Sequence, residues 1–541
     1  MIKEVTDATL LQIENEFGSY GHEDTDYLRD LVRMIRGYGI NELILTADRA
    51  QHLRDGAVPG AVATVTCHGT ADDVTAALSS LSNFQPDLPR LVTLLDVNGT
   101  SRWGESTYHS TSSVAHFRRS LDLILSSNAS INIYAFAGGT NFGFWSGAVE
   151  DTGIDSSYVN IVRQAVRRRG RHHHRRARQH RSVDMVMVNH SVETAVDTTG
   201  LLYRPATTSY NYSPPPIISQ SGHSQFSLKY HALRRLLLDR GLISRLQTVP
   251  VNPSTSGIGM VRLDHQLNWQ NILNLIPGSP IFLDAPVFME QLNTQLGSGQ
   301  VHGWIVYRTR LPSATGNVNI SGTMRDRAQV YLNGHHVQTV YNHKMSAFSV
   351  IIPTLHNNKH VSQSPSVTST LELIVENMGR SSFGLLDDQR KGFEGAVSVH
   401  GKIVDSHWEH FSLDFSPAFL TAIKQSKDWL PTVRSLTTPQ GHGQGHGQGQ
   451  GQPTLYRGHF RIKQFKDTYI DMSKWTKGLV IVNGFVLGRY WNIGPQQSLY
   501  VPSPILSHGL NEILVFELER TLNAKVKFVA KSLWDNHKHR G

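Results

Sequence analysis

The sequence predicts a multidomain protein with an α/β region first and two all-β modules after it. The first 147 residues alternate short apolar runs with stretches of helical periodicity, which is typical of parallel strands joined by helices. From about residue 260 the chain changes to short alternating strands separated by Gly and Asn turns. A length of 541 residues is enough for about three domains.

The α/β region alternates predicted strands and helices. We expect its strands at 8–15, 41–48, 61–67, 90–97 and 131–139 and its helices at 27–39, 72–81 and 114–127. The strands end in small or polar residues, and the C-terminal strand ends carry the chemistry in folds of this class. These ends are Asn15-Glu16, Thr46-Ala47-Asp48, Cys67-His68-Gly69, Asp96-Val97-Asn98-Gly99 and Gly138-Gly139-Thr140-Asn141.

The all-β part is predicted to form two β-sandwich modules, at 260–435 and 454–541, joined by a Gly/His/Gln linker at 436–453. Asn333-Gly334 and Asn483-Gly484 each lie between β-rich runs and predict tight hairpin turns. Further strands are expected at 303–311, 327–341, 346–353, 371–377, 396–404, 478–491 and 510–519.

The formal charge of +9 comes from one segment. Residues 163–181 contain nine Arg and no acidic residue, and the rest of the chain is balanced. This excludes a surface that is basic overall and argues against nucleic acid as a partner. We interpret 148–208 as an inserted, disordered, low-complexity segment, either translated non-coding sequence or a tract that attracts polyanions.

The composition leaves the cellular compartment open. Cys67 is the one cysteine, so the fold cannot rely on an intrachain disulfide. The single cysteine favours a reducing compartment. The N-glycosylation sequons point instead to the secretory pathway, and they lie at Asn98, Asn128, Asn189, Asn211 and Asn319. No apolar run of about 18 residues predicts a membrane span, and no signal segment opens the chain.

The segment QIENEFGSYG (12–21) is the strongest candidate for a catalytic site. It places Asn15 and Glu16 where an apolar strand ends and a Gly-containing loop begins. A carboxyl group held there beside an amide suits a general acid/base. The alternative is a Glu that caps the following helix or pairs with an Arg.

The segment resembles glycoside hydrolase family 35, and the resemblance continues in the same order along most of the chain. It is carried by LTADRA (45–50), YAFAGGTNFGFWSGA (134–148), SYNYSPP (209–215), YRTRLP (307–312), MRDRAQVYLNG (324–334), LIVENMGRSSFG (373–384), KGFEG (391–395) and WTKGLVIVNGFVLGRYWNIGPQ (475–496). The resemblance implies a retaining hydrolase that removes terminal β-linked galactose. It also implies a (β/α)8 TIM barrel with one glutamate at the end of strand 4 and another at the end of strand 7, followed by galactose-binding-like jelly-roll modules.

Mapped onto this sequence, the resemblance makes Glu16 the acid/base, Asn15 the ligand of the sugar 2-hydroxyl and Tyr212 part of the galactose pocket. The nucleophile falls in LVTLLDVNGTSRWGE (91–105), at Leu95 without a gap or at Asp96 with a one-residue shift. Leucine cannot form a glycosyl ester, and aspartate is one methylene shorter than glutamate. We interpret the nearby Glu105 as the N-terminal acid of a helix.

Strands 1–3 of the barrel have no counterpart, so we expect a partial barrel of strands 4–8 at 1–147, with its end and a linker at 209–259. The chain is then a fragment, a misassembled gene model or a degraded relative. Two functions stay open: a β-galactosidase, or an inactive relative that at most binds glycans. The resemblance implies a galactosylated glycan or glycolipid as substrate, a lysosomal or secretory location and no cofactor or metal, and it leaves a homo-oligomer open.

Overall fold

The computed structural model describes most of the chain outside the basic insert and the spacer. The described residues are 10–20, 24–67, 69–96, 101–104, 113–151, 202–210, 226–249, 254–294, 299–311, 316–341, 348–352, 369–382, 388–405, 407–432, 451–519, 521 and 524–534. The tract at 163–181 and nearly all of the linker at 436–453 therefore lie outside the described residues.

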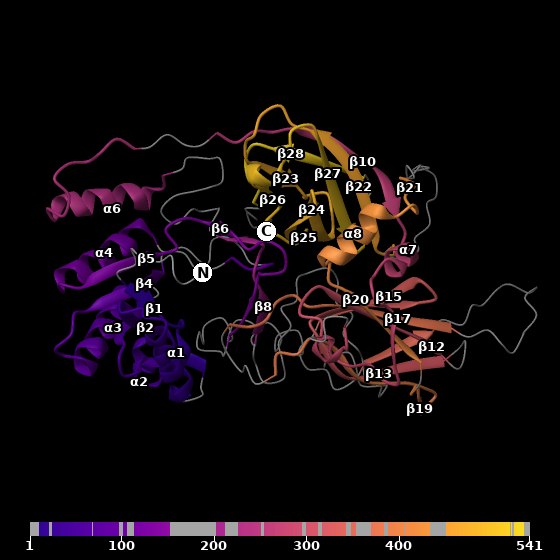
Figure 1. The fold of residues 1–541 in the computed structure, drawn as a ribbon, viewed down its shortest axis with the longest axis horizontal. Coiled ribbons are helices and arrows are strands. Elements are labelled where there is room, and N and C mark those ends of the chain that lie inside the picture. The colour runs from indigo at the N-terminus through magenta and orange to yellow at the C-terminus, as the bar shows by residue number, and fades with distance from the viewer. Residues whose placement is uncertain are drawn as a thin grey trace, which may run out of the picture.

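The N-terminal part is a parallel sheet with helices against it (Figure 1). Its strands are in the order β1-β2-β3-β4-β5. Their bounds are β1 Leu10–Gln12, β2 Leu43–Asp48, β3 Val62–Cys67, β4 Leu91–Asp96 and β5 Ser130–Tyr134. The connecting helices are α1 Thr25–Gly37, α2 Leu53–Gly56, α3 Ala71–Phe84 and α4 Val114–Ser126. Each predicted strand and helix of this region is confirmed in type, with shorter bounds for most of the strands.

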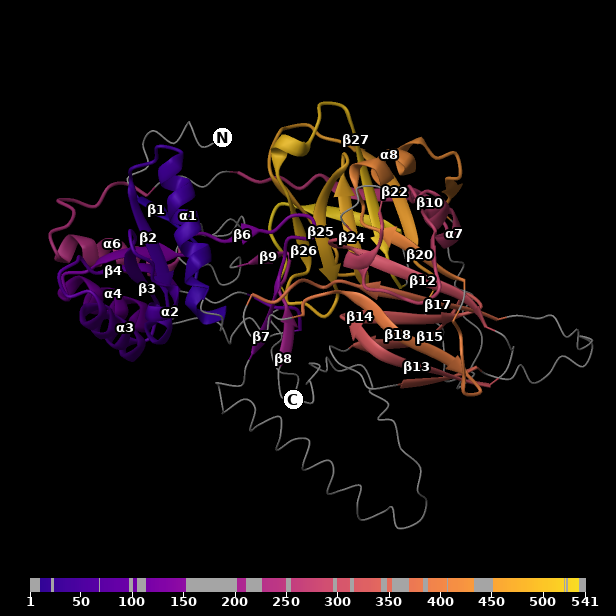
Figure 2. The ribbon, with the colours of Figure 1, turned by 60° about the horizontal axis from the view of Figure 1, so that its bottom comes forward.

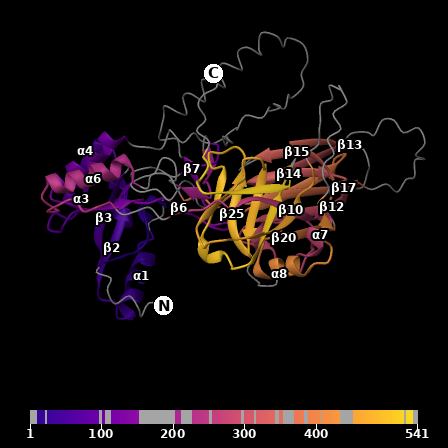
Figure 3. The same cartoon turned by 90° about the horizontal axis from the view of Figure 1, so that it is seen from above.

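One face of this sheet packs on helices through a continuous apolar core. Val65 of β3 and Leu95 of β4 point into this core, together with Leu121 of α4. Helix α6 (Leu228–Asp239) comes much later in the chain and completes the same core with Leu236. Figures 1 and 3 both show α6 beside α4.

The next domain is a sandwich of two antiparallel sheets, with strand orders β11-β20-β12-β17-β14-β15 and β16-β13-β18-β19. Their bounds are β11 Ile281–Leu283, β12 Trp304–Leu311, β13 Gly316–Arg325, β14 Arg327–Leu332, β15 His335–Tyr341, β16 Phe348–Ile352, β17 Ser369–Glu376, β18 Gly392–Val399, β19 Lys402–Ile403 and β20 Trp408–Leu413. Asn333 and Gly334 join β14 to β15 with φ of 50° and 77°, so this predicted hairpin is confirmed.

The C-terminal domain is a near-closed barrel with the order β25-β24-β27-β22-β10-β28-β23-β26 (Figure 2). Strand β10 (Gly259–Leu267) joins its two halves, because it pairs with β22 on one side and β28 on the other. The other strands are β21 Leu430–Pro431, β22 Thr454–Arg461, β23 Thr468–Asp471, β24 Lys477–Val482, β25 Phe485–Trp491, β26 Ser498–Val501, β27 Leu510–Glu517 and β28 Lys525–Val529. The predicted Asn483-Gly484 hairpin is confirmed, with φ of 51° and 79°.

Short elements connect the three parts. Their bounds are β6 Gly139–Thr140, β7 Ala148–Asp151, β8 Leu202–Pro205, β9 Ser209–Tyr210, α7 Trp269–Asn274 and α8 Pro417–Gln425. The two β domains share a second apolar core around Trp304, which contacts Phe415 and Phe516 edge-on. A buried ion pair between Lys477 and Glu376, 3.0 Å apart, crosses the same interface.

The predicted fold class is therefore confirmed: a partial TIM barrel is followed by antiparallel β domains. The domain boundaries stay predictions. Strand β10 is a feature that the sequence analysis did not anticipate, because residues near 260 pair with a sheet formed mainly by residues after 454.

We expect Trp304→Ala to destabilise the β domains by about 3–5 kcal/mol, because the indole is fully buried between them and its loss leaves a cavity. The measurement is the midpoint of urea unfolding, followed by tryptophan fluorescence and circular dichroism. Trp145→Ala is the matched control, since that side chain is 83% exposed. Equal shifts in the two variants would contradict the prediction.

Candidate active site

Glu16 lies in the turn that follows β1, at the C-terminal edge of the parallel sheet. Its backbone has a φ of 51°, and its N–H donates to the carbonyl of Ala47 at the end of β2, 2.8 Å away. Ser19 donates to the carbonyl of Glu16 through its backbone N–H and its hydroxyl. These bonds fix the turn, and the Glu16 side chain is 6% exposed.

Both carboxylate oxygens of Glu16 accept hydrogen bonds from neighbouring strands. Arg49 Nε, just after β2, lies 2.9 Å from Oε2, and Thr66 Oγ1 of β3 lies 2.7 Å from Oε1. Thr66 alternates along β3 with Val65, whose side chain enters the helix-facing core. Glu16 is therefore on the opposite face of the sheet, where an open barrel has its interior.

Asp48, the last residue of β2, is a second buried carboxyl group beside Glu16. It is 1% exposed, and the N–H of Gly18 donates to its Oδ1 at 2.9 Å. Burial raises its pKa to about 6, and the negative charge of Glu16 adds to the rise. A Cβ on residue 56 would lie 2.1 Å from Oδ2 of Asp48. Only glycine therefore lets the backbone approach this carboxyl group so closely.

Asp96 ends β4, at the same edge of the sheet as Glu16 but three strands away. The adjacent Leu95 is 1% exposed and packs in the helix-facing core, whereas Asp96 is partly exposed. Of the two aligned positions for a nucleophile, only Asp96 therefore carries a carboxyl group that is partly accessible. If β1 is strand 4 of a barrel, the strand order makes β4 strand 7.

Other polar groups surround Asp96. Tyr134, at the end of β5, pairs with it across the sheet, and burial together with the charges of Tyr210 and Asp96 raises the pKa of this phenol. Lys229 of α6 is only 6% exposed. Burial lowers its ammonium pKa to about 8, and the nearby Asp96 carboxylate opposes that change.

The remaining predicted residues are distributed as follows. Asn15 is exposed in the bend before Glu16. Tyr212 and Glu105 lie outside the described residues. Trp103-Gly104, the motif after β4, contacts other parts of the chain: Trp103 N–H donates to Pro205 and Gly104 N–H donates to Gly494.

The sequence analysis did not identify Arg49, Thr66, Tyr134 or Lys229 as site residues. Arg49 had a usable signal, since it lies just beyond the end of the predicted strand 41–48, whereas Tyr134 lies inside the predicted strand 131–139 and gave none. Thr66 and Lys229 had none, because a threonine inside a strand and a lysine in a helix are ordinary residues until the packing brings them to a carboxylate.

Known families cover most of this architecture. Residues 4–162 match the family described as glycosyl hydrolases family 35, residues 286–414 match the first all-beta domain of beta-galactosidase, and residues 453–511 match the galactose-binding domain of beta-galactosidase. The partial barrel and both β domains thus define a glycoside hydrolase architecture.

Individual relatives agree with this class. Beta-galactosidase of Bos taurus is 30% identical over 531 residues, which cover 94% of this chain and 67% of that protein. Beta-galactosidase-1-like protein 3 of Rattus norvegicus and beta-galactosidase-1-like protein 2 of Homo sapiens are each 28% identical, over 94% of this chain and 66% of their own lengths. The chain belongs to glycosyl hydrolase family 35, and it spans about two thirds of the length of these relatives.

Two further findings concern other kinds of site. Within the described helices, none combines the length and apolarity that a membrane crossing needs. Among the residues that the structure describes, no three His, Cys, Asp or Glu side chains converge in a way that could hold a metal ion.

Asp48→Asn should reduce the pH dependence of stability around β2 and β3. The carboxyl group holds its proton with a pKa of about 6 in the fold, against 3.8 ordinarily. Its contribution to stability is therefore fully present below pH 4 and is lost as pH rises through 6, on the order of 2 kcal/mol. Asparagine is neutral throughout and can still accept from Gly18.

The measurement is hydrogen exchange of residues 43–67 at pH 4 and at pH 6.5, corrected for intrinsic exchange rates. Asp87→Asn is the control, because Asp87 is exposed. A wild-type chain whose protection in this segment does not fall between the two pH values would contradict the prediction.

Proposed function

We propose that this chain is a β-galactosidase-type exo-glycosidase that removes terminal β-linked galactose from glycans or glycolipids by a retaining, two-carboxylate mechanism. The observation that carries the proposal is the presence of Glu16 and Asp96 at the same edge of one parallel sheet, three strands apart. The names of the relatives supply the substrate class. A lysosomal or secretory location is part of the proposal.

Glu16 is the proposed general acid/base. In the first step its proton goes to the glycosidic oxygen while the bond from that oxygen to the anomeric carbon breaks. The hydroxyl of Thr66 can donate to the carboxylate and accept from the carboxylic acid, so it can hold Glu16 in both protonation states. Asn15, in the adjacent bend, is proposed to bind the sugar 2-hydroxyl, and Tyr212 to line the pocket.

Asp96 is the proposed nucleophile. Its carboxylate would form an ester with the anomeric carbon, and water, deprotonated by Glu16, would then release galactose and regenerate Asp96. The mechanism needs the two carboxyl groups about 5–5.5 Å apart around the sugar. The aspartate side chain is one methylene short of a glutamate, and an error of that order can reduce the rate about 10²-fold.

One observation favours the second candidate, an inactive relative that binds glycans. Lys229 is buried beside Asp96, and its ammonium is charged below a pKa of about 8. A carboxylate that neutralises a buried ammonium is held by that charge and is a weaker nucleophile. In this case the fold and the β domains remain, while the first chemical step is lost.

Glu16→Gln should lower the hydrolysis of an aryl β-galactoside at pH 4–5 by about 10²–10⁴-fold, because glutamine cannot donate a proton to the leaving oxygen. The measurement is kcat/KM with purified chain. Glu14→Gln is the control, since Glu14 lies two residues earlier and accepts from Tyr27 instead. Equal activity of the wild type and Glu16→Gln would remove the proposal.

Asp96→Glu should raise kcat/KM by about 10- to 100-fold, because the added methylene restores the reach towards the anomeric carbon. Asp96→Asn should abolish turnover, since an amide cannot form the glycosyl ester. If the wild type and Asp96→Glu are both inactive while each retains its circular dichroism spectrum, the binding-only candidate replaces the hydrolase.

A further inference from the structure

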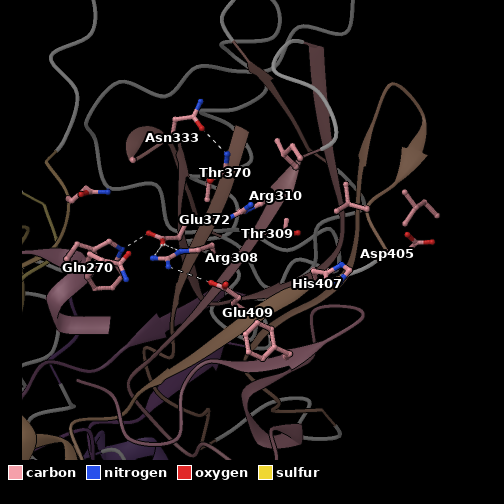
Figure 4. Close-up of a pocket in the computed structure, with 17 residues that line it drawn as sticks. Gln270, Arg308, Thr309, Arg310, Asn333, Thr370, Glu372, Asp405, His407 and Glu409 are labelled. Carbon is pink, nitrogen blue, oxygen red and sulfur yellow. Dashed lines mark hydrogen bonds and ion pairs between the residues drawn. The ribbon is translucent and has the colours of Figure 1, made fainter. Parts of the chain in front are cut away.

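A cavity with a charged floor lies on the first β domain (Figure 4), and Figure 1 shows this domain well away from the parallel sheet. Its volume is about 930 Å³, which is within the range of small-molecule sites. Strands β11, β20, β12 and β17 form its floor, and the β14–β15 turn and residues 403–405 and 407 border it. Of the residues proposed for hydrolysis that the structure describes, none lines it.

The register of the strands explains why polar side chains meet here. Phe282, Glu409, Arg308 and Glu372 are successive cross-strand neighbours, so their side chains form one row on one face of the sheet. The same face of β12 also carries Trp304. The first half of this β12 face is buried in the core between the two β domains. The second half extends beyond that core and lines the floor of the cavity.

Ion pairs hold the charged side chains of this row in place. Arg308 lies between two carboxylates, 2.8 Å from Glu372 and 3.6 Å from Glu409, as Figure 4 shows. Glu372 also accepts a hydrogen bond of 2.5 Å from the indole of Trp269 on α7. The side chains of Arg308 and Glu372 are 18% and 8% exposed, so this part of the floor is rigid and pre-formed.

The border offers further groups for a ligand. Arg310 is exposed, and in the part of the chain that the structure describes it has no ion-pair partner. Phe282 is 65% exposed and Ile403 is 63% exposed, so both present apolar surface to a ligand beside the charged floor. Gln270 and Gln452 add amide groups at the edge, whereas the amide of Asn333 is bonded to Ser369 and Thr370.

These groups together select a neutral polyhydroxylated ligand. The two arginines of the lining face three carboxylates, those of Glu372, Glu409 and Asp405, so no net positive charge attracts an anion. The carboxylate and guanidinium groups can each bond two adjacent hydroxyls, and an exposed phenyl ring offers a flat apolar surface for the C–H face of a sugar. An extended peptide would need a free strand edge, whereas this cavity lies on the face of a sheet.

We propose that this cavity is a saccharide-binding site that takes neutral oligosaccharides, separate from the candidate active site. The site does not depend on the hydrolase activity proposed above. It would hold a glycan chain on the β domain by stacking on Phe282 and by hydrogen bonds to Glu409 and Arg310. Binding there would be weak for a single sugar and stronger for a chain of several.

The test is saturation-transfer NMR and calorimetry with the full chain carrying Glu16→Gln, so that no substrate is consumed. The probes are a panel of neutral tetrasaccharides, galactose-, glucose- and mannose-terminated, and a sulfated tetrasaccharide as the anionic arm. We expect at least one neutral probe to bind with a Kd of about 1 mM or lower. Phe282→Ala and Arg310→Ala should each weaken it by at least tenfold.

Phe465→Ala is the matched control, because Phe465 is 44% exposed on the other β domain. The proposal is overturned if no neutral probe binds at about 10 mM, a concentration well above the expected Kd. It is also overturned if only the sulfated probe binds, or if the binding is unchanged in Phe282→Ala and Arg310→Ala. Because the assay measures binding in a variant without the acid/base, its result is independent of whether the wild-type chain hydrolyses galactosides.

Discussion

The burial of the Glu16 carboxyl group is the constraint on which the candidate site depends. A carboxyl group on a side chain that is 6% exposed must be hydrogen-bonded, and its donors come from just after β2 and from β3. These donors reach it only if β1, β2 and β3 are parallel neighbours in register. The sheet and the position of Glu16, the proposed acid/base, therefore support each other, and the hydrogen bond from Gly18 to Asp48 fixes the turn between β1 and α1.

The β domains also hold the loops that follow the strands of the sheet. Gly104 after β4 donates to Gly494, and Gly143 after β5 donates to Val486 of β25. Arg489 of the same strand donates to the carbonyl of Phe144 at 3.1 Å. The edge of the sheet that carries Glu16 and Asp96 is thus tied to the C-terminal domain, which explains how a module without proposed chemistry can influence the geometry of the site.

In the proposed mechanism activity depends on Asp96, whereas family membership does not. The match of residues 4–162 to family 35 extends over many positions, so it holds with one shortened side chain. The proposed chemistry tolerates that change less well, because an ester bond forms only within a narrow range of distance and angle. Lys229 bears on the same question, because it is buried and the negative charge of Asp96 opposes the lowering of its ammonium pKa.

The sequence by itself determined the elements and the turns. Asn333-Gly334 and Asn483-Gly484 specify their hairpins, because Asn and Gly are the residues that adopt the positive φ angles of these turns. The alternation of strands and helices before residue 147 follows from local periodicity. Glu16 could be proposed because the motif around it is contiguous. Only the tertiary structure decided that Thr66 bonds Glu16, that Lys229 approaches Asp96, and that the row from Phe282 to Glu372 floors a cavity. These contacts join segments far apart in the chain, and they are set by strand order and by the packing of whole domains, which no local pattern records.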